Sequence, residues 1–201
     1  MHTCIYVQHH MGLSSNPAGF QSVAEQLVVK TFSELYFRES LIRAKCAQWE
    51  FKVLPGLLER RILKRMRIIM DRCPPRVWSV FFRTLWNGWA THERMKQLVC
   101  QRPCLLGCGW DEDSLKHYCC CNVYWDFLRA HRINGNRRFG QQRSRETALL
   151  VAPNIDEDDV VHLGVGLYAL YRTVNTLRFS VNSMDSHPST MLRMFAKRAL
   201  D

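Results

Sequence analysis

Apolar residues recur at helical spacing along most of this chain, and this pattern predicts a mostly helical protein. The first stretch, residues 22–50, contains neither Gly nor Pro and has charged residues between its apolar positions. A Pro-Gly pair separates it from a second helix, which is predicted over 57–72. Two consecutive prolines then end that helix and open a third over 75–89. This third helix is apolar nearly all round and is therefore expected to be buried.

The helical pattern resumes after a cysteine-rich stretch. A short helix is predicted over 122–131, and the polar, basic stretch 134–145 is expected to be a loop because it holds two glycines. Acidic residues at 156–159 favour a helix start, since carboxylates stabilise the positive end of the helix dipole. That helix is expected to reach residue 181, and a last basic helix follows over 190–200. We see no convincing strand pattern or internal repeat and therefore expect an all-α fold, a small helical domain with one inserted Cys/His zinc knuckle.

The cysteines are clustered rather than spread along the chain. Six of the nine lie between residues 100 and 121, and such clustering in a reducing compartment indicates metal binding. The spacing Cys104-x3-Cys108-x8-His117-x3-Cys121 offers three thiolates and one imidazole, a closed tetrahedral ligand set for one Zn²⁺ ion. No general base stands at a spacing that would leave zinc an open position, so we expect a structural site and not a catalytic one.

The residues around these ligands also favour a metal site. Two glycines bracket Cys108 and permit the tight backbone turn that a metal-binding loop needs. If the chain is helical from Ser114 onward, His117 and Cys121 lie four residues apart on one helical face. Asp113 and Ser114 would then cap that helix and leave its ligands in the first two turns.

The ligand set leaves alternatives open. Cys120 or Cys119 could take the place of Cys121, and Cys100 could replace either of the first two thiolates because it precedes Cys104 by the same spacing. The alternative without a metal is a group of buried free cysteines, which are common in protein cores. That alternative explains neither the glycines nor the histidine.

The sequence divides into four regions. We expect a flexible tail over 1–20, a helical region over 21–99, the zinc knuckle over 100–125 and a C-terminal helical region over 126–201. No apolar run reaches the length of a membrane span, and the N-terminal residues lack the pattern of a signal peptide. We therefore expect an intracellular protein, nuclear or cytoplasmic, with no membrane partner.

The formal net charge of +10 favours RNA or DNA as the partner. Each phosphate that Lys or Arg neutralises releases a condensed counterion, whereas the alternative is a merely solvated basic surface. The basic residues form three clusters, one on the helix predicted over 57–72, one beside the cysteines and one in the loop 134–145. Their members are Arg60, Arg61, Lys64, Arg65 and Arg67; Arg94, Lys96 and Arg102; and Arg137, Arg138, Arg143 and Arg145.

We expect phosphate contacts from the second and third clusters, whereas the first is equally consistent with a solvated helix face. Tryptophans could add stacking on unpaired bases. Trp86 and Trp89 are candidates, but Trp86 is expected in the core, and Trp110, beside the glycines of the cysteine-rich turn, is the better one. The residues expected to bind nucleic acid are Arg94, Lys96, Arg102, Trp110, Arg137, Arg138 and Arg143.

One region of the chain resembles a known family. The run Trp-Asn-Gly-Trp-Ala-Thr at 86–91, the pair Cys104 and Cys108, and Glu-Asp-Ser-Leu-Lys-His-Tyr-Cys at 112–119 followed by Cys121 are similar to the zinc-knuckle segment at the C-terminal end of non-LTR retrotransposon reverse transcriptases, of the type common in dinoflagellate genomes. The family usually has two residues between its first cysteines and four between the histidine and the last ligand, where this chain has three in both places.

The resemblance implies a module that binds zinc and contacts template RNA or target DNA. The family's polymerase carries a Tyr/Phe-x-Asp-Asp motif that holds two Mg²⁺ ions, and this motif does not occur in the sequence. We therefore expect no polymerase activity from the chain itself and expect it to associate with a separate polymerase chain. Two other hypotheses fit the sequence: a zinc-stabilised protein-interaction module, and a non-functional fragment of a retroelement. The salt dependence of binding distinguishes the protein-interaction module from a nucleic-acid-binding one, because electrostatic binding to nucleic acid weakens steeply as the salt concentration rises.

Overall fold

The computed structural model describes residues 39–49, 51, 56–95, 103–109, 112–131, 140–179 and 187–199, and every regular element in these ranges is a helix. The expected all-α class is therefore confirmed. The chain divides into two compact units, 1–44 and 45–201, and the cysteine-rich segment belongs to the second. The described helices are α3 (Glu39–Ala47), α4 (Leu57–Arg72), α5 (Pro75–Leu85), α6 (His92–Met95), α7 (Leu115–Tyr118), α8 (Asn122–Ala130), α9 (Arg145–Ala148), α10 (Glu157–Phe179) and α11 (Pro188–Arg198).

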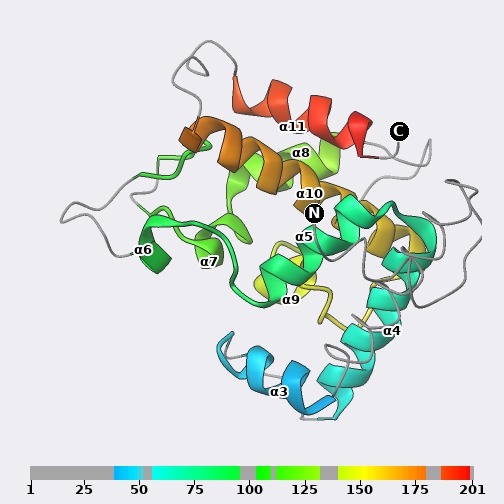
Figure 1. Ribbon diagram of the computed structural model, residues 1–201. Helices are drawn as coiled ribbons and strands as arrows, with labels where there is room; N and C mark the ends of the chain where they lie inside the picture. The colour runs from blue at the N-terminus through cyan, green and yellow to red at the C-terminus, as the bar shows by residue number, and fades with distance from the viewer. Residues whose placement is uncertain are drawn as a thin grey trace, which may run out of the picture. The chain divides into compact units, whose positions relative to one another are not determined.

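Helix α10 is the central element of the second unit. It packs against α4, α5, α8 and α11 (Figure 1), and its residues from Asp159 through Leu167 are all buried. Its start follows the acidic pattern, because the Asp156 carboxylate accepts the backbone N–H of Asp159 at 2.8 Å and three acidic residues occupy the first turn. The predicted helix start is thus confirmed; the helix is described as far as Phe179, and its expected end at residue 181 lies outside the described residues.

Two glycines allow neighbouring helices to approach α10 closely. A Cβ atom on Gly166 would lie 2.4 Å from the Leu128 side chain of α8. A Cβ atom on Gly164 would lie 3.3 Å from Ile69 of α4 and 3.6 Å from Val77 of α5. These positions let the apolar faces of the flanking helices meet α10 at short range.

The bounds predicted over 57–72, 122–131 and 190–200 are confirmed to within two residues, whereas the helix predicted over 75–89 is shorter than expected. Helix α4 matches its prediction at both ends, but α5 ends at Leu85 and not at residue 89. The chain leaves the helix because Asn87 adopts a positive φ of 50° and the Gly88 N–H bonds to the Arg83 carbonyl at 2.6 Å. A left-handed Asn near a helix end is rarer than Gly, so the apolar run alone overestimated the helix length.

Part of the N-terminal prediction lies outside the described residues. Within the stretch 22–50, helix is described only for Glu39–Ala47, and the expected tail over 1–20 also falls outside the described ranges. Among the helices that are described, none combines the length and apolar character needed to cross a lipid bilayer.

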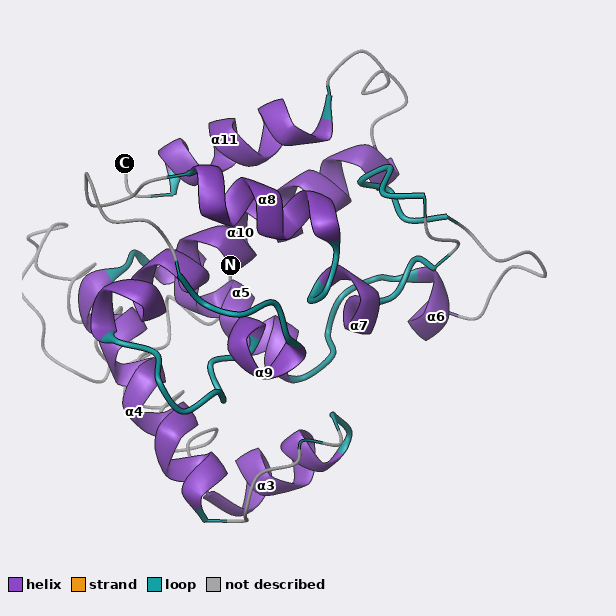
Figure 2. Cartoon of the chain, turned by 180° about the vertical axis from the view of Figure 1, so that it is seen from behind, coloured by secondary structure: helices purple, strands orange, loops and turns teal. Residues whose placement is uncertain are grey.

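The loop that joins α9 to α10 runs along α4 (Figure 2). Arg65 of α4 is 6 % exposed and donates to the carbonyl oxygens of Leu150 and, at 2.9 Å, Pro153. Arg61 reaches the Val151 carbonyl at 3.4 Å. Burial lowers the pKa of Arg65 to about 10, so the guanidinium stays charged at neutral pH. These two members of the first basic cluster therefore hold a loop in place, whereas Arg60, Lys64 and Arg67 are exposed.

Candidate metal centre

The four residues expected to bind zinc come together in the structure. Their ligand atoms, three Sγ and one imidazole nitrogen, all lie within 4.8 Å of one another, and the residues are Cys104, Cys108, His117 and Cys121. The Sγ atoms of Cys104 and Cys121 are 3.9 Å apart, and Cys108 Sγ lies 3.2 Å from His117 Nε2. A zinc tetrahedron with the usual bond lengths has S–S edges of about 3.8 Å and S–N edges of about 3.6 Å. The cluster could therefore hold a metal ion with only small adjustments.

The first two cysteines are placed by a tight turn. The Gly107 N–H bonds to the Cys104 carbonyl at 3.0 Å. Gly107 and Gly109, on either side of Cys108, have φ values of 72° and 85°. Side chains other than hydrogen are disfavoured at such angles. The glycines that bracket Cys108 in the sequence thus have the conformational role expected of them.

The second pair of residues does not share a helix, so that prediction is wrong. Helix α7 has four residues and includes His117, whereas Cys121 lies beyond it as the N-cap of α8. The chain tightens between them: the N–H groups of Cys120 and Cys121 bond to carbonyls three residues earlier, at 2.8 and 3.3 Å. Cys121 then adopts an extended backbone and turns its thiol toward the cluster.

Ser114 caps α7 as expected, because its Oγ accepts the His117 N–H at 3.0 Å. Asp113 has a different role from the predicted cap. Its carboxylate is 2 % exposed and accepts hydrogen bonds from the Arg178 guanidinium at 2.6 Å, the Tyr118 hydroxyl at 2.7 Å and the His92 N–H at 3.0 Å. The ion pair with Arg178 fastens this segment to the last turn of α10.

The pKa values of the Cys104 and Cys121 thiols are shifted in opposite directions. The pKa of Cys121 is lowered, first because its thiolate accepts a hydrogen bond from Cys104, and further by His117 and the backbone N–H groups at the start of α8. The pKa of Cys104 is raised by that same shared proton and by burial. A bound divalent cation replaces such a proton, since thiol ligands bind metal in the deprotonated form.

The neighbouring cysteines are placed elsewhere. Cys119 is completely buried, its carbonyl accepts the indole N–H of Trp125 at 2.8 Å, and burial raises the pKa of its thiol. Cys120 is half-buried, and its thiol pKa is also raised by burial. Cys100, the remaining alternative ligand, lies outside the described residues. The described geometry therefore favours Cys121 as the last ligand.

Only part of the expected nucleic-acid-binding set falls within the described residues. Arg94 is exposed on α6 and reaches the Trp89 carbonyl at 3.4 Å, and Arg143 is exposed and donates to Asn122 Oδ1. Trp89 is 1 % exposed and thus cannot stack on a base, whereas Trp86, expected in the core, is half-buried. The members outside the described ranges are Lys96, Arg102, Trp110, Arg137 and Arg138.

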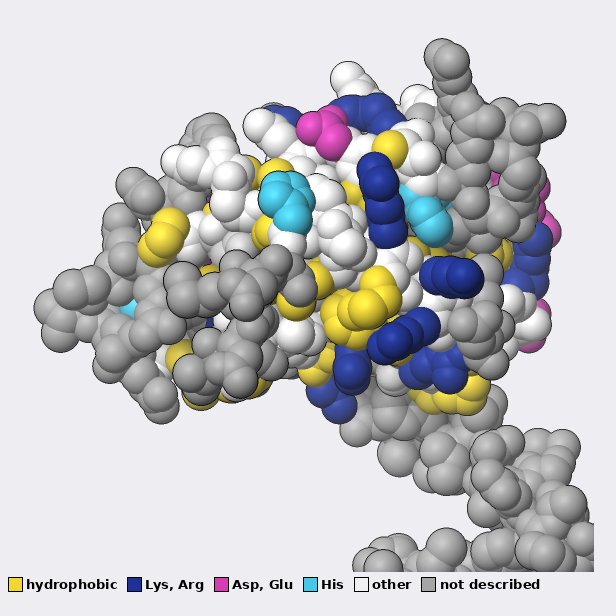
Figure 3. Space-filling view, turned by 90° about the horizontal axis from the view of Figure 1, so that it is seen from above, with side chains coloured by type: hydrophobic (Ala, Val, Ile, Leu, Met, Phe, Trp, Pro, Cys, Tyr) yellow, Lys and Arg dark blue, Asp and Glu magenta, His cyan; other side chains and the backbone are white. Residues whose placement is uncertain are grey.

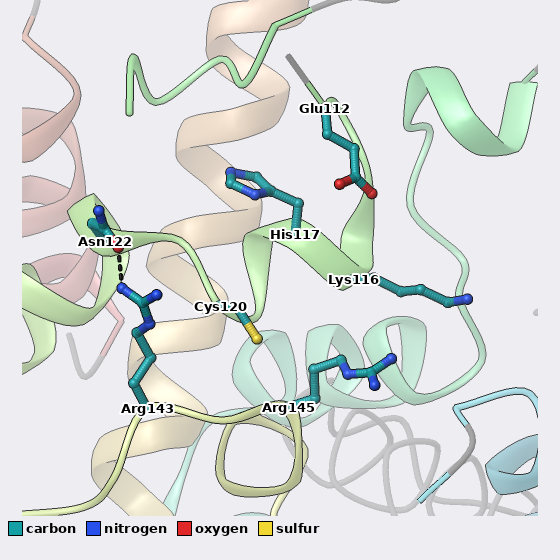
Figure 4. Close-up of a pocket in the computed structure, with 7 residues that line it drawn as sticks. All are labelled: Glu112, Lys116, His117, Cys120, Asn122, Arg143 and Arg145. Atoms are coloured by element: carbon teal, nitrogen blue, oxygen red, sulfur yellow. Dashed lines mark hydrogen bonds between the residues drawn. The ribbon is translucent and has the colours of Figure 1, made fainter. Parts of the chain in front are cut away.

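A pocket of about 260 Å³ opens beside the metal cluster (Figure 4). Its lining combines cationic side chains with polar groups and one carboxylate. The lining residues are Glu112, Lys116, His117, Cys120, Asn122, Arg143 and Arg145. The sequence placed Arg143 and Arg145 in one basic cluster, but it gave no sign that Lys116 would join them, because more than twenty residues separate them along the chain.

Comparisons with protein-family models, with curated proteins and with solved structures gave no match for this chain.

Proposed function

We propose that the chain is a zinc-stabilised module that binds RNA or DNA. The observation that carries the zinc assignment is the convergence of three thiols and one imidazole within 4.8 Å. Zinc favours tetrahedral sites of this composition, and a site with four protein ligands leaves no open position for catalysis. The metal has a structural role: it joins the turn at Cys104–Gly109 to α7 and to the start of α8.

Nucleic-acid binding is supported by a second observation, a basic face of the molecule. Lys and Arg side chains gather on the surface seen from above, over α11 (Figure 3). Helix α11 contains no acidic residue, and α8 and α10 pack beside it and add further arginines. The exposed cations of this face are Arg129, Arg172, Arg193, Lys197 and Arg198. One of these cations, Arg129, is paired with the exposed Asp126 at 3.4 Å. Arginine forks suit phosphate oxygens, and a predominantly positive face fits a phosphate backbone.

The basic face is not among the three clusters singled out in the sequence, because its members come from three helices. A signal was available in part, since the segment 188–198 has three cations and no carboxylate. On this proposal the contacts are mainly to phosphates and carry little sequence preference.

The resemblance to the C-terminal region of non-LTR retrotransposon reverse transcriptases supports a role beside a polymerase. We propose that this chain supplies nucleic-acid contacts to a separate polymerase chain and incorporates no nucleotides itself. Template-dependent primer extension by the purified protein would contradict this part of the proposal.

The test is to measure zinc content together with RNA and DNA binding at a low and a moderate salt concentration. The proposal expects one zinc per chain and an affinity that falls by orders of magnitude as salt rises. Binding that is absent at low salt would contradict the nucleic-acid proposal. Salt-independent association with a protein partner would instead favour the protein-interaction module.

A further inference from the structure

We infer that the pocket beside the metal cluster is a binding site for a phosphate group. The inference that this phosphate belongs to a nucleic-acid backbone rests on the proposed function, whereas the phosphate site itself rests on the pocket. The pocket is formed by three stretches of chain: the segment through α7, the start of α8, and the residues that lead into α9.

The charge of the pocket favours an anion. Three of its lining residues are cationic, Lys116, Arg143 and Arg145, and one, Glu112, is acidic. The Glu112 carboxylate accepts a hydrogen bond from the hydroxyl of Ser114, the N-cap residue of α7. In the described part of the chain, none of the three cations forms an ion pair with a carboxylate.

The side chain of one arginine and the backbone of the other are held in position before any ligand arrives. Arg143 donates to Asn122 Oδ1 at the first turn of α8, which leaves other N–H groups of its guanidinium for a ligand. Arg145 begins α9, whose N-cap Ser144 accepts the Thr147 N–H at 3.0 Å and so fixes the backbone there. Figure 4 shows Cys120 between these two arginines. A prepositioned guanidinium group such as that of Arg143 binds phosphate oxygens with strong, charge-assisted hydrogen bonds.

The size of the pocket restricts the ligand. At about 260 Å³ it lies below the roughly 300–1,000 Å³ of pockets that enclose a whole organic ligand. A single phosphate group is therefore a better occupant than a complete nucleotide. Bases and sugars would extend out of the pocket into solvent or onto the neighbouring surface.

These cations have one alternative role, because three thiolates and one Zn²⁺ ion leave a net charge of −1 beside them. They could serve only to balance that charge. In that case their removal would weaken zinc binding and leave phosphate binding unaffected, so the zinc content of each variant is part of the test.

The experiment compares the zinc-loaded full chain with the double variant Arg143→Gln/Arg145→Gln. The control is Arg60→Gln/Arg67→Gln, which removes the same charge from exposed positions on α4. The first probe is inorganic phosphate, titrated at constant ionic strength against chloride and followed through backbone amide NMR shifts. We expect saturable shifts at Lys116, Cys120 and Asn122 in the parent and the control, and none in the pocket variant.

The second probe is a fluorescent single-stranded oligonucleotide. The pocket variant is expected to bind it about tenfold more weakly or worse, with unchanged zinc content, whereas the control changes affinity by much less. Phosphate that causes no saturable shifts in the pocket overturns the inference, even if the oligonucleotide binds through the basic face. Saturable phosphate shifts in a chain that binds no oligonucleotide support the pocket and overturn the proposed function.

Discussion

At the scale of single residues, Asp113 connects the metal-binding segment to two other parts of the second unit. Its carboxylate accepts hydrogen bonds from Arg178 near the end of α10, from Tyr118 within the segment and from the backbone N–H of the first residue of α6. Burial and the adjacent carboxylate also raise the pKa of Tyr118, so its hydroxyl remains a donor at neutral pH. Removal of this carboxylate would leave several buried donors without an acceptor.

We therefore expect Asp113→Ala to lower the free energy of unfolding by about 3–5 kcal/mol, because the Arg178 side chain, only 11 % exposed, would lose its counterion. Chemical denaturation measures this change. The control is Asp126→Ala, which breaks an exposed pair with Arg129 at 3.4 Å and should cost about 1 kcal/mol or less. Equal losses of unfolding free energy in the two variants would show that the buried pair stabilises the fold no more than an exposed pair does.

A second prediction at this scale concerns His162. Its Nε2 lies 2.9 Å from the Leu128 carbonyl, to which the neutral ring donates, and burial lowers its pKa below the ordinary 6.5. Burial also lowers the pKa of the neighbouring His131. Below pH 6.5 the unfolded chain then binds more protons than the folded one. The free energy of unfolding is therefore expected to fall as the pH drops through and below this value.

Denaturation of the parent and of His162→Gln at about pH 7.5 and about pH 5.5 tests this expectation. The parent should lose more stability than the variant, because the variant lacks one titrating ring. Protonation of the metal ligands affects both proteins alike and cancels in the comparison.

At the scale of secondary-structure elements, the metal-binding segment, residues 103–131, has little regular structure before α8. Helix α7 has four residues, and the turn that carries Cys104 and Cys108 has no regular structure. Isolated helices shorter than about 12–15 residues are marginal in water, so α7 depends on contacts with its surroundings. A metal ion that joins these pieces would supply a large part of that support.

We predict one zinc per chain, and loss of that zinc in Cys108→Ala and in His117→Ala. Removal of the metal should accelerate amide hydrogen exchange over residues 103–131, while the buried part of α10 stays protected. Elemental analysis and exchange mass spectrometry measure the two effects. Cys46→Ser is the matched control, because Cys46 is 2 % exposed and its thiol pKa is raised to about 12. Equal zinc loss from this control would show that the ligands are assigned wrongly.

The sequence predicted the long elements better than the short ones. Periodicity over 57–72 located α4 at both ends, since its apolar stripe and the flanking Gly and Pro agree. The four-residue spacing of His117 and Cys121 predicted that they share a helix, because nothing in that spacing shows that the chain tightens at Cys120. The four metal ligands could be selected from spacing, whereas the pair Asp113–Arg178 could not, since it depends on how two distant segments pack.

At the scale of the second unit, the positions of the cations decide where a polyanion can bind, more than the total charge does. Some cations of α4 are used inside the fold, as the bonds from Arg65 to loop carbonyls show. The exposed cations of α11 have no acidic neighbour on their own helix. The face over α11 is therefore a better place for a long polyanion than the exposed side of α4. Its contribution to binding can be measured separately from that of the phosphate pocket.

The last prediction is that this face accounts for much of the salt dependence of binding. Replacement of Arg193, Lys197 and Arg198 by Gln removes three candidate phosphate contacts. For a single strand, each contact contributes about 0.7 to the slope of log affinity against log salt, so the slope should become shallower by about 2. Fluorescence anisotropy with one oligonucleotide at several salt concentrations measures it. The triple control Arg60→Gln/Lys64→Gln/Arg67→Gln removes the same charge from exposed positions on α4 and should leave the slope nearly unchanged. Equal slope changes in both triple variants would mean that binding responds to net charge alone and that α11 forms no defined interface.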